Sequence, residues 1–129
     1  MNQVGITALY AGISGLLMLF LAGRVAQLRM RHSVMFGDGQ VVELERAIRV
    51  HGNAVEYVPL GLLLLLIAEL GEVGAFWLHL FGLLLVGGRA LHAYGLSRFE
   101  GTSLGRFIGI SMTWLAMLGL SLSVLFLGL

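Results

Sequence analysis

The hydrophobic positions of this chain form four long runs, and short polar segments separate them. The apolar spans cover residues 4–23, 40–70, 74–94 and 104–127. In the second span residues 54–68 are the apolar part, and its helix is predicted to begin near Gln40. A membrane-crossing helix needs roughly 20 mostly apolar residues. The pattern therefore predicts an all-α fold, a bundle of four transmembrane helices that forms one domain over residues 1–129.

Composition strengthens the membrane interpretation. Of the 129 residues, 58% are hydrophobic and 12% are charged, whereas soluble domains carry about 25% charged residues. The chain has no cysteine and a formal net charge of +1, so thiolate metal sites are excluded and a nucleic-acid partner is disfavoured. We predict no metal site.

The nineteen glycines lie mostly within the spans and predict closely packed helices, because small residues let membrane helices approach one another.

The arginines predict an orientation. All eight basic residues are arginine, and they cluster around the first and third connectors. The second connector instead contains Glu69 and Glu72. Cytoplasmic connectors carry the excess of basic residues, so we expect connectors one and three in the cytoplasm and both termini outside. The membrane would be a bacterial inner membrane.

One polar face interrupts the second span. Residues 45–59 read ERAIRVHGNAVEYVP, and at 100° per residue five of their polar side chains fall within roughly 100° of arc: Arg46, Arg49, Asn53, Glu56 and Tyr57. An ionisable residue within a membrane usually faces the bundle interior and has a partner. Glu56 therefore indicates either a structural ion pair with another helix or a pocket for a small anion.

Other spans place cations at the same level. Arg29 lies at the end of the first span, Arg89 and His92 lie one turn apart in the third, and Arg106 opens the fourth. These charges would repel one another without anions between them. A bound ligand is one source of such anions, and counter-ions or membrane lipid headgroups are another, since cationic cytoplasmic ends attract anionic lipid.

Three motifs carry a resemblance to a known family. The segment ERAIRVHGNAVEYVP, the segment GRALHAYG at 88–95 and the pair GR at 105–106 resemble, in order and spacing, the MAPEG family of membrane-associated proteins in eicosanoid and glutathione metabolism. The resemblance covers nearly the whole chain. It implies a homotrimer of four-helix subunits that binds glutathione between neighbouring subunits, near the cytoplasmic face.

The resemblance also assigns roles to individual residues. Arg49, Asn53, Glu56 and Tyr57 would hold the polar groups of glutathione. Glu56 suits the amino group, and Arg49 suits a carboxylate through a bidentate charge-assisted pair.

Further residues would complete that site. Arg29 and His51 would reach it from the neighbouring subunit, and Arg106 would be the catalytic residue that activates the thiol. His92 occupies a position where the family often has tyrosine. Four residues later the family often has another tyrosine, and this chain has Leu96.

The function that the resemblance implies is glutathione-dependent chemistry on an apolar, lipid-soluble substrate. The enzyme would conjugate glutathione to an electrophile or reduce a lipid hydroperoxide. The alternative is a non-catalytic membrane binding or assembly protein whose arginine-rich pocket holds a lipid or another small anion.

Overall fold

A computed structural model describes residues 3–98, 101 and 103–129, and these residues form four α-helices. Residues 1, 2, 99, 100 and 102 lie outside this description, and the last three belong to the predicted third connector. The helices are α1 (Gly5–His32), α2 (Val42–Leu70), α3 (Ala75–Arg98) and α4 (Leu104–Leu127). Each is long and apolar enough to cross a membrane. The all-α, four-helix prediction is confirmed.

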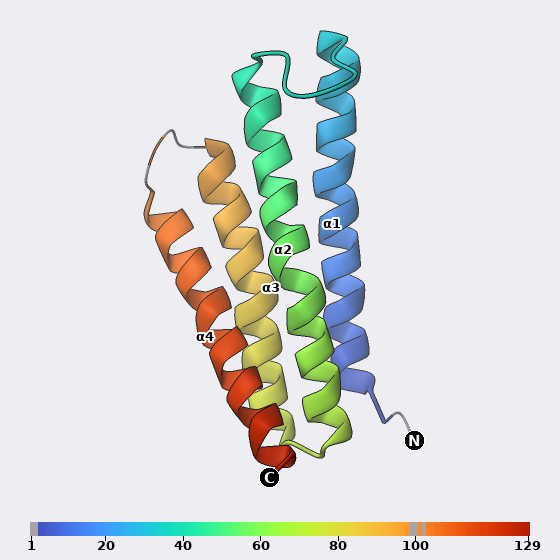
Figure 1. The fold of residues 1–129 in the computed structure, drawn as a ribbon, viewed down its shortest axis with the longest axis vertical. Coiled ribbons are helices and arrows are strands. Elements are labelled where there is room, and N and C mark those ends of the chain that lie inside the picture. The colour runs from blue at the N-terminus through green and yellow to red at the C-terminus, as the bar shows by residue number, and fades with distance from the viewer. Residues whose placement is uncertain (1–2, 99–100, 102) are drawn as a thin grey trace.

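The four helices run alternately up and down (Figure 1). Within the described residues, α1 and α4 each pack against both α2 and α3 and do not contact one another. The α1–α2 and α3–α4 connections lie at one end of the bundle, and the α2–α3 turn and both termini lie at the other (Figure 1). The two arginine-rich connectors thus share one end. The trimer and the side of the membrane stay predictions.

Glycines bring α3 and α4 into close backbone contact. A Cβ added to Gly109 would lie 2.6 Å from the backbone nitrogen of His92 and 2.7 Å from the carbonyl oxygen of Gly88. A Cβ on Gly95 would lie 2.7 Å from the backbone nitrogen of Arg106. Real side-chain carbons do not approach backbone atoms this closely, so only glycine permits this interface. The contact places this glycine-lined side of α3 directly against α4.

A glutamate fixes the other end of the bundle. Glu69, near the end of α2, accepts hydrogen bonds from the first-turn amides of α1, with Oε1 at 2.8 Å from the Ile6 nitrogen and Oε2 at 2.7 Å from the Thr7 nitrogen. The N-cap residue of α1, Val4, provides no side-chain cap. A carboxylate that satisfies helix N-terminal amides also complements the helix dipole. Glu69 therefore pins the start of α1 to the end of α2.

The buried apolar residues form two clusters along the bundle. One lies nearer the arginine-rich end and the other nearer the termini. Their buried members are Leu21, Val50, Ala54, Val58, Ala93 and Leu96 in the first, and Tyr10, Leu65, Ala68, Leu78 and Leu120 in the second. Large apolar side chains on the outer surface, such as Phe107, Leu118 and Phe126 of α4, remain exposed, as a lipid-facing surface requires.

Candidate functional site

The start of α4 is positively charged. Ser103 caps the helix, and its Oγ accepts a hydrogen bond from the Arg106 backbone nitrogen at 3.3 Å. Arg106 therefore lies in the first turn, where the helix dipole is already positive and no acidic residue offsets it. One guanidinium nitrogen of Arg106 donates to the carbonyl of Gly101. A guanidinium has five N–H donors, so this bond leaves donors for an anion.

Arg89 of α3 is the most deeply buried charge among the described residues, at 2% exposure. Its Nε donates to Thr113 Oγ1 on α4 at 2.8 Å, and its guanidinium carbon lies 4.9 Å from the centre of the Tyr57 ring on α2. Both Nη atoms are buried and have no hydrogen-bond partner within the described part of the chain. A buried cation with unused donors is costly, so this position is suited to an additional acceptor.

Tyr57 connects the three helices at this level. Its ring lies over Arg89, and its hydroxyl accepts a hydrogen bond from Trp114 Nε1 of α4 at 3.2 Å. Cation–π contacts of this kind add about 0.5–2 kcal/mol, depending on desolvation. The polar face predicted on the second span thus turns, at Tyr57, toward α3 and α4.

The remaining charges gather around Arg89. Glu56 and Tyr57 lie close enough to Arg89 to interact with it electrostatically, and His92 interacts with both Arg89 and Arg106. His92 is buried, whereas Glu56 is exposed on the outer side of α2. The arrangement is a cluster of cationic side chains with the carboxylate of Glu56 nearby, and these charges are complementary to a ligand that carries carboxylate or thiolate groups and one ammonium group.

The other predicted site residues lie elsewhere on α1 and α2. Arg49 is exposed and forms a loose pair with Glu45, at 3.9 Å, the i, i+4 support that the sequence indicates. Asn53 and His51 are partly buried on α2. Arg29 donates to the carbonyl of Gly37 at 2.8 Å and so holds the first connector of its own chain.

Of the predicted set, the structure places Tyr57 against Arg89, and His92 lies one turn after Arg89 on α3. Glu56 interacts with Arg89, and Arg106 with His92, through longer-range electrostatics. The structure does not bring Arg29 or His51 to these residues within one chain. Sequence reasoning noted Arg89 only as one of several cations and gave no role to Thr113. The glycines that flank Arg89 and face α4 were the available signal, because they mark the side of α3 that is packed.

Comparison with known proteins agrees with this geometry. The sequence model of the MAPEG family matches residues 7–126. The chain belongs to the MAPEG family. The match confirms the resemblance based on the three motifs.

This MAPEG chain is also similar to proteins named "Inner membrane protein YecN" from Escherichia coli strain K12 and from Escherichia coli O6:H1 strain CFT073. Each is 41% identical over 117 residues, which cover 88% of this chain and 85% of the relative. Together with the four apolar helices, the family and these relatives identify an integral membrane protein.

Proposed function

We propose that this protein is a glutathione-dependent membrane enzyme that conjugates glutathione to an apolar electrophile or reduces a lipid hydroperoxide. The observation that carries the proposal is the buried Arg89 guanidinium, whose two Nη atoms have no partner within the described residues. Glutathione has two carboxylates, an ammonium group and a thiol. The cationic cluster around Arg89, with the Glu56 carboxylate nearby, matches that pattern of charges.

Arg106 supplies the activation step in this proposal. A free thiol has a pKa near 8.5, so little thiolate is present at neutral pH. Lowering the thiol pKa by about two units requires ~2.7 kcal/mol of preferential stabilisation of the thiolate. A guanidinium at the positive end of α4, in a partly dry site, is suited to provide it.

Two reactions follow from a bound thiolate. In conjugation, the sulfur forms a bond to an electrophilic carbon, and the leaving group departs with the electron pair of the broken bond. In peroxide reduction, the sulfur attacks the terminal oxygen of the hydroperoxide, the O–O bond breaks, and the lipid alkoxide takes a proton to become an alcohol. The thiol of a second glutathione then displaces water from the sulfenic acid, giving glutathione disulfide.

The proposal includes a homotrimer with the arginine-rich connectors in the cytoplasm. Arg49, Asn53 and Glu56 lie on the side of α2 that a neighbouring subunit would cover. Arg29 and His51 would come from that neighbour. Arg29 would then exchange its bond to the Gly37 carbonyl, or use its remaining donors, to reach a glutathione carboxylate.

One observation favours the non-catalytic alternative. Leu96 is buried beside His92, and an apolar side chain there provides no phenol to assist the thiol. In the alternative, the arginine-rich site binds a small anion or a lipid headgroup and no reaction follows.

The test is an ultraviolet difference spectrum that reports thiolate while glutathione is added to the purified protein in detergent. We expect a saturating thiolate signal for the native chain and none for Arg106→Ala. Arg31→Ala removes an exposed arginine from the last turn of α1 and should leave the signal unchanged.

The binding and catalytic alternatives separate in the same experiment. Glutathione binding by calorimetry without a thiolate signal would support the non-catalytic alternative. No binding by a folded oligomer would reject glutathione as the ligand.

A further inference from the structure

A groove lies between α1, α2 and α3, whereas Arg89 contacts α4. Its volume is about 800 Å³, and α1, α2 and α3 line it at the arginine-rich end. None of the eight predicted site residues lines it. The deeper wall is apolar and includes Leu17, Phe20, Leu21 and Val50. Ala90 and Ala93 of α3 keep the groove open, because their side chains are small.

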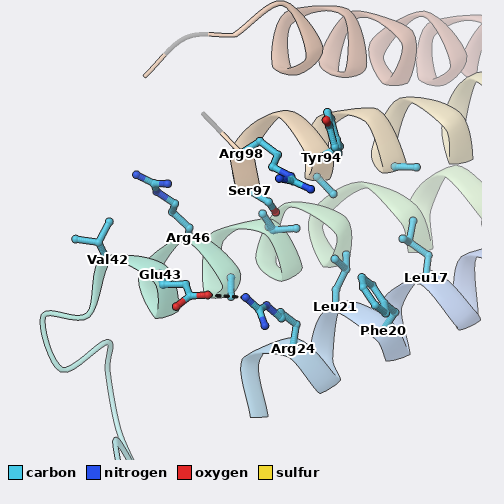
Figure 2. Close-up of a pocket in the computed structure, with 14 residues that line it drawn as sticks. Leu17, Phe20, Leu21, Arg24, Val42, Glu43, Arg46, Tyr94, Ser97 and Arg98 are labelled. Carbon is cyan, nitrogen blue, oxygen red and sulfur yellow. Dashed lines mark hydrogen bonds and ion pairs between the residues drawn. The ribbon is translucent and has the colours of Figure 1, made fainter. Parts of the chain in front are cut away.

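The outer part of the groove is cationic. Each of the three helices contributes one arginine to the lining: Arg24 from α1, Arg46 from α2 and Arg98 from α3. Glu43 is the carboxylate in the lining and forms an ion pair with Arg24 at 2.5 Å. Figure 2 shows this pair between α1 and α2, with Arg46 labelled further along α2 and Arg98 on α3. The lining side chains thus carry three formal positive charges and one negative charge.

The polar and apolar parts are ordered along the helix axis. On α1 the lining begins with Leu17 and ends with Arg24, a rise of about 10 Å at 1.5 Å per residue. On α3 it begins with Ala90 and ends with Arg98, about 12 Å. Tyr94 lies between them, and the Arg98 guanidinium carbon is 5.7 Å from the centre of its ring. An aromatic ring next to arginines, outside an apolar segment, is the composition of a membrane–water interface.

We propose that this groove binds one anionic glycerophospholipid, with the headgroup phosphate at the arginines and an acyl chain along the apolar wall. A phosphate is an anion that an arginine guanidinium such as that of Arg98 can bind through paired hydrogen bonds. The surrounding bilayer supplies an amphiphile whose charge and chain are in the same order as the lining. None of the predicted glutathione-site residues lines the groove, so this inference does not depend on that function.

The test uses native mass spectrometry of the delipidated protein in neutral detergent. Dioleoyl phosphatidylglycerol, dioleoyl phosphatidylethanolamine and oleate are added separately. We expect phosphatidylglycerol to bind more tightly than the other two. Arg98→Gln should weaken its binding about fivefold, the effect of one arginine near an anionic lipid surface. Glu43→Gln should strengthen it by a similar factor, because Arg24 is released from its ion pair.

Two further variants keep the proposal falsifiable. Ala90 is exposed in the groove, so Ala90→Trp should fill the space for the chain and abolish binding without altering the core. Arg31→Gln removes an equal charge outside the groove and should change nothing. Equal affinity for the two phospholipids would overturn the proposal. Oleate binding as tight as phosphatidylglycerol would overturn the phosphate assignment, and insensitivity to Ala90→Trp would place the lipid elsewhere.

Discussion

Replacement of Thr113 by valine tests whether the Arg89 cluster stabilises the bundle as its geometry implies. Thr113 is fully buried, and its Oγ1 lies 2.8 Å from Arg89 Nε. Valine has nearly the same shape, so Thr113→Val removes the acceptor and leaves no cavity. A hydrogen bond to a charged group contributes about 1.5–3 kcal/mol, whereas bonds between membrane helices reach at most about 1.7 kcal/mol. We therefore expect a loss of about 1.5 kcal/mol, roughly tenfold in the unfolding equilibrium.

The measurement is unfolding in mixed micelles with increasing sodium dodecyl sulfate, followed by circular dichroism. Thr113→Ser keeps the hydroxyl and should retain most of the stability, apart from the cost of one lost methyl group. In the Arg89→Met background, Thr113→Val should cost less than about 0.5 kcal/mol, because the partner is already absent. An equal loss in both backgrounds would show that Thr113 acts through helix packing and not through Arg89, and would refute the reasoning.

Three further predictions concern packing, capping and the aromatic contact. Gly109→Ala should force α3 and α4 apart and lower the free energy of unfolding by about 1–3 kcal/mol in the same assay. Gly12→Ala, whose added Cβ meets only open space, should be neutral. Equal losses for the two variants would refute the close contact. Glu69→Gln should weaken the cap on α1 by about 1 kcal/mol and speed hydrogen exchange of its first-turn amides; unchanged exchange would contradict the cap. Tyr57→Leu should lower the free energy of unfolding by about 1 kcal/mol more than Tyr57→Phe, because phenylalanine keeps a ring over Arg89. Equal losses for the two variants would show that the cation–π contact does not contribute to stability.

The fold was predictable because each membrane span can be recognised from the apolar composition of its own residues. Four apolar runs and three polar connectors give the number of helices without any knowledge of their contacts. The polar face of α2 was also predictable, since 3.6-residue periodicity alone puts Asn53, Glu56 and Tyr57 on one side. The role of Glu69 was not predictable in this way, because its hydrogen bonds join residues 62 and 63 positions apart. Only the packed bundle brings the end of α2 to the start of α1.

Arg89 and Arg98 differ in burial in a way that the sequence alone does not predict. Both are arginines in the second half of α3, near a span end, where arginine side chains often extend to the interface. In the structure Arg89 is 2% exposed, whereas Arg98 is exposed. Nine residues at 100° each place them on opposite sides of α3, so periodicity separates the two. It does not say which side is packed against α4, and the glycines at 88, 95, 105 and 109 supply that information only once the two helices are paired.

The two proposals assign different ligands to two sides of α3. The side with Arg89 and His92 is held against α4 by close backbone contact, and its charges are those proposed for a tripeptide. The face with Tyr94 and Arg98 borders an open groove with a long apolar wall, so it suits an amphiphile that the membrane itself provides. Arg106→Ala should therefore abolish the thiolate signal and leave phosphatidylglycerol binding intact, and Arg98→Gln should do the reverse. A variant on one face of α3 that altered the binding of both ligands would show that the two sites are coupled through α3. The close packing of α3 against α4 would then transmit the change.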